Sequence, residues 1–172
     1  MKHKQWGTTL GPTRAIWIAA VIDCEGTLTV HVPFNKTNGG RNLQVYGRVE
    51  MANYDVPFLL HNLCGGSMGQ PKQKGNRKEH FYWNISSNGL RWLLPQIMKH
   101  LIVKKRHAEI LLAILSGNPS GRTGSRYKMP YERLRKLITE LRTINYKGKT
   151  ADATLIRKCV SYQLADTIQG KM

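Results

Sequence analysis

The chain has few acidic residues, few cysteines and no long apolar run. It has 172 residues, and only 10 are Asp or Glu against 27 Lys or Arg. No apolar stretch approaches the roughly 18 residues of a membrane-spanning helix, which excludes a spanning protein. The three cysteines, Cys24, Cys64 and Cys159, are an odd number at unrelated spacings, so no disulfide framework is expected. The first residues, MKHKQWGTTLGPTR, lack the apolar core of a signal peptide, and we expect a protein that is not secreted.

Positive charge is what the sequence has in excess. A formal charge of +17 with 41% hydrophobic residues predicts a folded domain that binds a polyanion. The charge is not confined to one amphipathic helix, so a membrane surface is not the expected partner. The histidines and cysteines have no zinc-site spacing, and Gly148-Lys149-Thr150 lacks the earlier glycine of a phosphate-binding loop.

Hydrophobic periodicity predicts the element order α-β-β-α-β-β-α, followed by a helical tail. The first helix is expected to start at Pro12, with Thr13 as candidate N-cap, and to end just before Gly26. Asp55 is the candidate cap of the second helix, and Pro95 is expected to kink the third. Strands are expected at 27–32, 43–51, 67–72 and 80–86, and the later helices at 87–101, 104–115, 131–145 and 151–168.

The four strands alternate apolar and polar residues, which favours an α+β fold with an antiparallel sheet and helices on one face. The other face would carry hydrogen-bonding and cationic side chains, at Thr29, His31, Gln44, Tyr46, Arg48, Gln70, Lys72, His80, Tyr82 and Asn84. Such a face can recognise base edges in a major groove. Asn35, Lys74 and Arg77, in the loops between strands, complete the candidate nucleic-acid contacts. For any single residue, an ordinary solvated surface is the alternative.

The segment Ile18 to Gly26, IAAVIDCEG, breaks a local rule of helix electrostatics. It places two acids, Asp23 and Glu25, at the C-terminal end of an apolar helix, where the dipole disfavours anions by about 0.3–1 kcal/mol. Such rule-breaking is expected at functional sites, and Mg²⁺ takes carboxylate oxygens together with substrate phosphates. The alternative is that Asp23 makes a local backbone hydrogen bond and that Glu25 is solvated.

This segment resembles the LAGLIDADG motif of the homing endonucleases, matched residue for residue as IAAVIDCEG. The resemblance extends from Thr13 to Ser116 through the order of elements and three further matches, at Cys64-Gly65-Gly66, at Trp83 with Ile85, and at LIVKKRHA over 101–108. It implies an αββαββα core at 13–116 with an antiparallel four-stranded saddle sheet. Residues 1–12 would be an N-terminal arm, and residues 117–172 a loop and C-terminal helical extension.

The resemblance also implies roles for individual residues. Glu25, at the eighth motif position, would coordinate a divalent metal at the scissile phosphates, assisted by the backbone carbonyl of Cys24. The motif's name has Asp at that position, and the longer Glu side chain would shift the metal geometry. Lys104 matches a lysine near the cleavage centre, and Asp23 would hold the helix end. Glu50 is the candidate for a polar residue near the end of the second strand. The implied ion is Mg²⁺, with Mn²⁺ or Ca²⁺ as substitutes for binding.

The chain has one such motif, and single-motif members of the family act as homodimers through this helix. The expected interface is Ile18, Ala19, Ala20, Ile22 and Asp23. The expected activity is site-specific double-strand DNA cleavage of the intron-homing type, by hydrolysis at a long near-palindromic site, with no small-molecule cofactor. The alternatives are an RNA maturase of the same family and a DNA-binding relative that has lost cleavage. The expected location is wherever the host intron resides, whether an organelle, the prokaryotic cytoplasm or a phage-infected cell.

Overall fold

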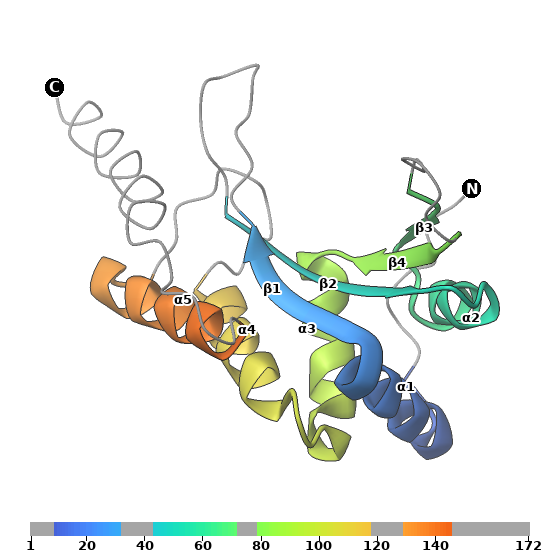
Figure 1. The fold of residues 1–172 in the computed structure, drawn as a ribbon. Helices are drawn as coiled ribbons and strands as arrows, with labels where there is room; N and C mark the ends of the chain where they lie inside the picture. The colour runs from blue at the N-terminus through green and yellow to red at the C-terminus, as the bar shows by residue number, and fades with distance from the viewer. Residues whose placement is uncertain (1–8, 32–42, 72–78, 118–128, 146–172) are drawn as a thin grey trace, which may run out of the picture. The chain divides into compact units, whose positions relative to one another are not determined.

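The computed structural model describes residues 9–31, 43–71, 79–117 and 129–145. The elements in chain order are α1 (Pro12–Glu25), β1 (Gly26–His31), β2 (Gln44–Met51), α2 (Asp55–Cys64), β3 (Ser67–Gly69), β4 (Phe81–Ile85), α3 (Ser87–Ile97), the 3₁₀ turn η1 (Met98–His100), α4 (Lys105–Ser116) and α5 (Tyr131–Asn145) (Figure 1). The predicted α+β class and the αββαββα order are confirmed. The expected helix at 151–168 lies outside the described residues.

Two compact units divide the described residues, and each is made of interleaved segments. Unit 1 takes the described residues within 1–28 and 46–109, and unit 2 takes those within 29–45 and 110–172. In unit 2, α5 buries Leu134, Ile138 and Leu141, which share one face of the helix. The expected boundaries at residues 12 and 116 stay predictions.

The sheet has the strand order β1-β2-β4-β3. β4 pairs antiparallel with both β2 and β3, and Val49 of β2 lies opposite Trp83 of β4. Both of these side chains are completely buried on the helical side of the sheet. Gly47 lies on the same side, where a Cβ would press against side chains of β1, β4 and α3. Glycine therefore lets α3 approach the sheet closely.

The turn between α2 and β3 depends on glycine. Gly65 and Gly66 have positive φ angles, and a Cβ on Gly66 would overlap the main-chain oxygen of Asn84. The indole Nε1–H of Trp83 donates a 2.7 Å hydrogen bond to the carbonyl of Gly65. This turn therefore fixes β3 against β4.

The structure corrects several sequence expectations about helix ends. The N-cap of α1 is Gly11 rather than Thr13, with Pro12 at the first helical position, where its missing N–H is not needed. The N-cap of α2 is Tyr54 rather than Asp55. The side chain of Asn53 instead accepts the N–H of Asp55 at 2.7 Å. The third helix includes Pro95, ends at Ile97 and continues as η1, short of the expected residue 101.

The third strand is shorter than expected, and its predicted side-chain parity was wrong. β3 ends at Gly69, and Met68 lies opposite the buried Trp83. Even-numbered residues of β3 therefore face the helices, and Gln70 follows the strand as an exposed residue. Pro71 comes next and lacks the N–H that a longer strand would need. Among the described residues, no helix has the length and apolar character to cross a membrane.

Candidate functional site

Asp23 links the last turn of α1 to the beginning of α4, within unit 1. Its Oδ2 accepts the N–H of Ile102 at 2.6 Å, and its Oδ1 accepts the N–H of Lys104 at 2.8 Å. The carbonyl of Lys104 accepts the N–H of Ala108, which makes Lys104 the N-cap residue just before α4. A carboxylate is favourable at a helix N-terminus because it binds free N–H groups and complements the dipole. Asp23 therefore holds a helix end, as expected, but the end belongs to a distant helix.

The ammonium of Lys104 makes the return contact. Its Nζ donates a 2.6 Å hydrogen bond to the backbone oxygen of Asp23, at the C-terminal end of α1. Helix C-termini favour cations because their last carbonyls carry partial negative charge. The structure thus brings the ammonium of Lys104 to Asp23 in the motif helix. Asp23 lies two residues before Glu25 in the chain.

Glu25 is the last residue of α1, and both Glu25 and Cys24 are exposed. Among the described residues, the Glu25 carboxylate has no hydrogen-bond or ion-pair partner. Nor does that part of the chain contain a group of three His, Cys, Asp or Glu residues able to hold a metal. Mg²⁺ usually keeps several waters and binds one or two carboxylates together with phosphates. An exposed Glu25, with the Cys24 carbonyl beside it, fits a site of that kind rather than an all-protein cage.

Most of the residues expected at the dimer interface lie in the core of their own chain. Ile18 and Ala19 are 0% exposed and Ile22 is 2% exposed, on the side of α1 that contacts α3 and η1. Of the five expected residues, Ala20 is exposed. Ile16 lies one helical turn before Ala20 and is 51% exposed. Ile16 and Ala20 are therefore apolar residues on the outer side of α1, which also carries the exposed Thr13, Arg14 and Cys24.

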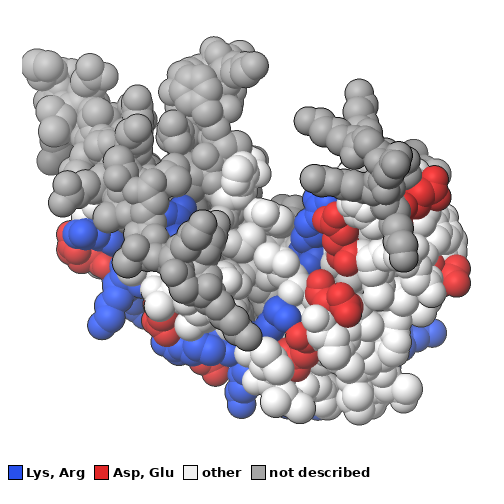
Figure 2. Space-filling view, in the orientation of Figure 1, with Lys and Arg blue, Asp and Glu red and all other residues white. Residues whose placement is uncertain are grey.

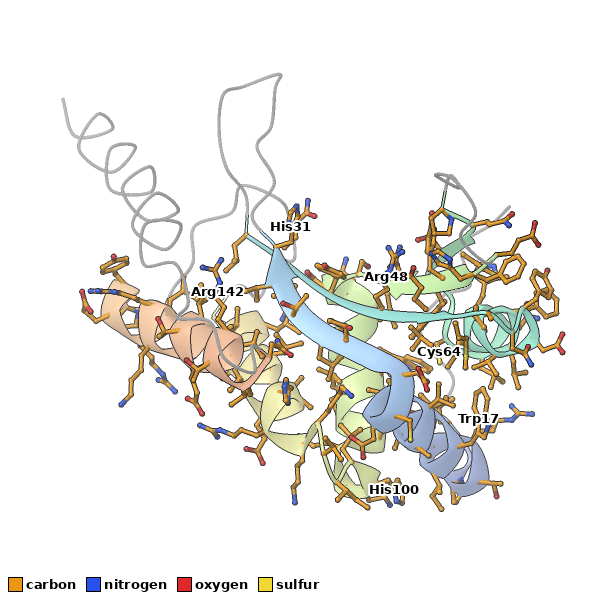
Figure 3. The ribbon with its side chains drawn as sticks, viewed as in Figure 1. Trp17, His31, Arg48, Cys64, His100 and Arg142 are labelled. Carbon is orange, nitrogen blue, oxygen red and sulfur yellow. The ribbon has the colours of Figure 1, made fainter. Side chains whose placement is uncertain are left out.

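Seven of the candidate nucleic-acid contacts lie where the alternation predicts. They occupy the non-buried positions of their strands, with Thr29, His31 and Gln44 in unit 2. The four in unit 1 are Tyr46, Arg48, Tyr82 and Asn84, and we call these four the polar sheet face. In Figure 3, Arg48 extends from β2 on the side opposite α3. His80 precedes β4 and is partly exposed. Asn35, Lys72, Lys74 and Arg77 lie outside the described residues.

Arg48 is at the centre of a cluster that the sequence analysis did not anticipate. Its guanidinium forms an ion pair with Glu50, with 2.6 Å between Nη2 and Oε2, and lies 4.3 Å from the ring centroid of Tyr82. The other oxygen of Glu50 is 2.6 Å from Nε2 of His80. The available signal was the i, i+2 spacing of Arg48 and Glu50, which places both on one face of β2.

Most of the excess positive charge belongs to segments of the chain other than the strands that carry the polar sheet face. Of the 27 basic residues, 16 belong to segments outside the described residues, together with two of the 10 acids. In the described strands, Arg48 and Glu50 are the only Lys, Arg, Asp or Glu residues. Figure 2 shows basic and acidic side chains interspersed on the visible face. The polar sheet face is therefore suited to specific hydrogen bonding more than to general attraction of phosphates.

Comparison with solved structures identifies the fold. No family model and no curated protein sequence matches the chain. The archaeal intron-encoded homing endonuclease I-Vdi141I, complexed with DNA, matches with a TM-score of 0.67 and 21% identity, over 88% of this chain and 98% of that one. The homing endonuclease I-CvuI, in a DNA complex with Mg, matches with a TM-score of 0.62 and 15% identity, over 87% and 94%. The LAGLIDADG homing endonuclease I-SmaMI, bound to cleaved DNA, matches with a TM-score of 0.59 and 20% identity, over 88% and 50%. The chain has the LAGLIDADG homing endonuclease fold.

The resemblance drawn from the sequence is thus confirmed at the level of the fold. The nine residues of IAAVIDCEG cover the second half of α1 and the first residue of β1. In this LAGLIDADG fold, the motif therefore ends where the helix meets the sheet. The two acids at that junction have different environments, since Asp23 is fixed by backbone N–H groups and Glu25 is exposed.

Proposed function

We propose that the protein is a site-specific double-strand DNA endonuclease of the intron-homing type, which acts as a homodimer with a divalent metal. The observation that carries the proposal is the double link between Asp23 and Lys104. It places a cation at the end of the motif helix that also carries the exposed Glu25. The fold is shared with homing endonucleases whose structures contain bound DNA.

The chain's own residues divide the chemistry between them. Glu25 and the carbonyl of Cys24 would hold Mg²⁺ together with phosphate oxygens of the DNA. A metal bound there supplies activation of water and stabilisation of charge on the phosphate. The ammonium of Lys104 stabilises the negative charge that develops during phosphodiester hydrolysis. Asp23 keeps Lys104 in place by fixing the backbone from which it extends.

The polar sheet face is the proposed contact with double-stranded DNA. Its hydrogen-bonding side chains face away from the helices and suit base edges in the major groove. The charge of +17 adds a strong, salt-dependent attraction for the phosphate backbone. We expect specificity to come from the sheet and general affinity from the basic segments.

Exposed apolar side chains support the homodimer. Ile102 and Val103 are 87% and 68% exposed, next to the backbone that Asp23 fixes. Ile16 and Ala20 are further exposed apolar residues of unit 1, and burial of such side chains favours association. The match covers 98% of I-Vdi141I but 50% of I-SmaMI, so I-SmaMI is nearly twice as long as this chain. We place the two-fold contact on the outer side of α1, where it brings two Glu25 residues together.

Cleavage of supercoiled plasmid that carries the host's intronless allele tests the proposal. With Mg²⁺, the wild type should convert the plasmid to a linear product. Glu25→Gln should abolish cleavage and keep DNA binding, since the carboxylate is exposed and supports no described contact. Glu109→Gln is the matched control, because Glu109 is an exposed acid of α4 that pairs with Arg106.

Four results are decisive. Cleavage by the wild type and by Glu109→Gln, but not by Glu25→Gln, supports the proposal. Near wild-type cleavage by Glu25→Gln contradicts the assignment of Glu25. Binding of the allele without cleavage by the wild type would favour the cleavage-deficient DNA-binding protein, and preferential binding of the intron RNA would favour the maturase.

A further inference from the structure

Among Lys, Arg, Asp and Glu, the described strands contain one basic residue, Arg48, and one acidic residue, Glu50. These two side chains bond to each other. Glu50 Oε2 accepts a 2.7 Å hydrogen bond from Nε of Arg48 and forms an ion pair with Nη2 of the same guanidinium at 2.6 Å. Side-chain exposure is 32% for Arg48 and 38% for Glu50, so both remain accessible from solvent. A carboxylate on a surface that receives DNA opposes the phosphates. Its presence there needs a reason other than affinity.

The contact selects which edge of the guanidinium can meet a base. Guanidinium has five N–H donors in one plane, and the edge formed by Nε and Nη2 is occupied by Glu50. The remaining edge, formed by Nη1 and Nη2, offers two parallel donors. Guanine presents two acceptors, O6 and N7, at the matching spacing in the major groove. Glu50 thus leaves Arg48 with the edge that suits a bidentate contact to guanine.

Two further residues fix the plane and the position of this pair. The ring of Tyr82 lies 4.3 Å from the guanidinium carbon of Arg48. Tyr82 is the residue opposite Glu50 in the sheet register, so all three side chains lie on one face. His80 Nε2 lies 2.6 Å from Glu50 Oε1, and it holds the oxygen that Arg48 does not use. An isolated surface ion pair orders side chains weakly, but a pair held by two further side chains is pre-organised.

We propose that Glu50 is a specificity-determining positioning residue, which orients Arg48 to recognise one guanine in each half-site. The inference rests on the proposed DNA-binding function and adds a residue whose role is selectivity at the expense of affinity. Glu50 does not touch the base itself. It acts by fixing Arg48 and by disfavouring the orientations in which Arg48 would bind a phosphate.

Selection from a randomised duplex library, at two salt concentrations, tests the proposal. Arg48→Ala should reduce the preference for guanine at one position per half-site by about tenfold, which corresponds to about 1.4 kcal/mol. Glu50→Ala should lose most of the same preference, although Arg48 is intact, and should bind non-specific DNA at least as tightly as the wild type. The double variant should lose no more preference than Arg48→Ala, because both changes act through one contact.

Two further variants separate positioning from simple charge. Glu50→Gln keeps one acceptor oxygen for Arg48 without the negative charge, so it should retain part of the guanine preference. Glu109→Ala removes an acid from an exposed Arg–Glu pair on α4, with 3.1 Å between Arg106 Nη1 and Glu109 Oε2. It should leave the sequence profile unchanged. Far-UV circular dichroism and thermal melting confirm that each variant is folded.

The possible failures are distinguishable. If Arg48→Ala loses the guanine preference and Glu50→Ala keeps it, Glu50 does not position Arg48 and the inference is wrong, while DNA recognition by this face stands. If Arg48→Ala leaves the profile unchanged, Arg48 does not recognise a base, and the inference falls with that assignment. If the wild type selects no sequence at all, the proposed site-specific DNA function is itself wrong, and not only the role of Glu50.

Discussion

Removing the Asp23 carboxylate tests the link that organises the candidate site. Asp23→Ala deletes the acceptor of two backbone N–H groups, at 2.6 and 2.8 Å, that lie between η1 and α4. A side chain that caps a helix N-terminus contributes typically about 1 kcal/mol and up to about 2. The Asp23 carboxylate accepts hydrogen bonds from two N–H donors but is partly exposed. We therefore expect Asp23→Ala to lower the free energy of unfolding by about 2 kcal/mol. In a chain of this size, that lowers Tm by about 4–8 °C.

Urea denaturation followed by far-UV circular dichroism measures the effect. All variants should be compared at one protein concentration, because association makes the apparent stability depend on concentration. Asp23→Asn keeps one acceptor oxygen and should lose about half as much as Asp23→Ala. Glu25→Ala is the matched control, and we expect a change within about 0.5 kcal/mol because its side chain is exposed. Equal midpoints for Asp23→Ala and Glu25→Ala would refute the reasoning that the two acids have separate roles.

Three more outcomes follow from the same contacts. Ala20→Arg should yield a monomer by light scattering without DNA, since Ala20 is exposed and tolerates the longer side chain in the protomer. The control Thr139→Arg, at an exposed position of α5, should leave the wild-type assembly. A stable monomeric wild type at micromolar concentration would contradict this. Gly66→Ala should destabilise by more than about 2 kcal/mol, because of its positive φ and backbone overlap, against less than about 1 for Gly11→Ala, where a Cβ meets open space. Lys104→Met should reduce single-turnover cleavage by about 100-fold with DNA affinity retained, and wild-type cleavage would remove Lys104 from the mechanism.

Local periodicity was sufficient to predict the fold because each element buries one face. In β2, the alternation of Val45, Gly47 and Val49 with polar residues predicts which side meets the helices, and all three are buried. The bounds predicted for α5, at 131–145, agree with the structure because its apolar residues recur at helical spacing. The caps were less predictable, since Gly11 precedes α1 without a capping side chain and Asn53, two residues before α2, accepts the N–H of Asp55.

The candidate site was predictable as residue types but not as contacts. Asp23 contacts backbone groups 79 and 81 residues away, and no local pattern encodes which N–H groups these are. The burial of Ile18 and Ala19 was likewise hidden, because α1 is apolar on more than one side and periodicity did not separate its inner and outer faces. The parity of β3 failed because three residues after a Gly-Gly turn carry too little alternation to set a register.

The neighbouring acids of the motif show how an exposed carboxylate can be placed with precision. An exposed carboxylate gains little from its own contacts, so its position must come from the backbone that carries it. Here both carboxylate oxygens of Asp23, two residues before Glu25, bond to backbone N–H groups next to α4. The side chain of Lys104 makes a second connection by donating to the Asp23 carbonyl. Glu25 is thereby held at the end of a doubly anchored helix with its side chain unused. The helix-dipole cost of two acids at a C-terminus is offset for Asp23 by the helix that it caps, and for Glu25 we expect a cation to offset it.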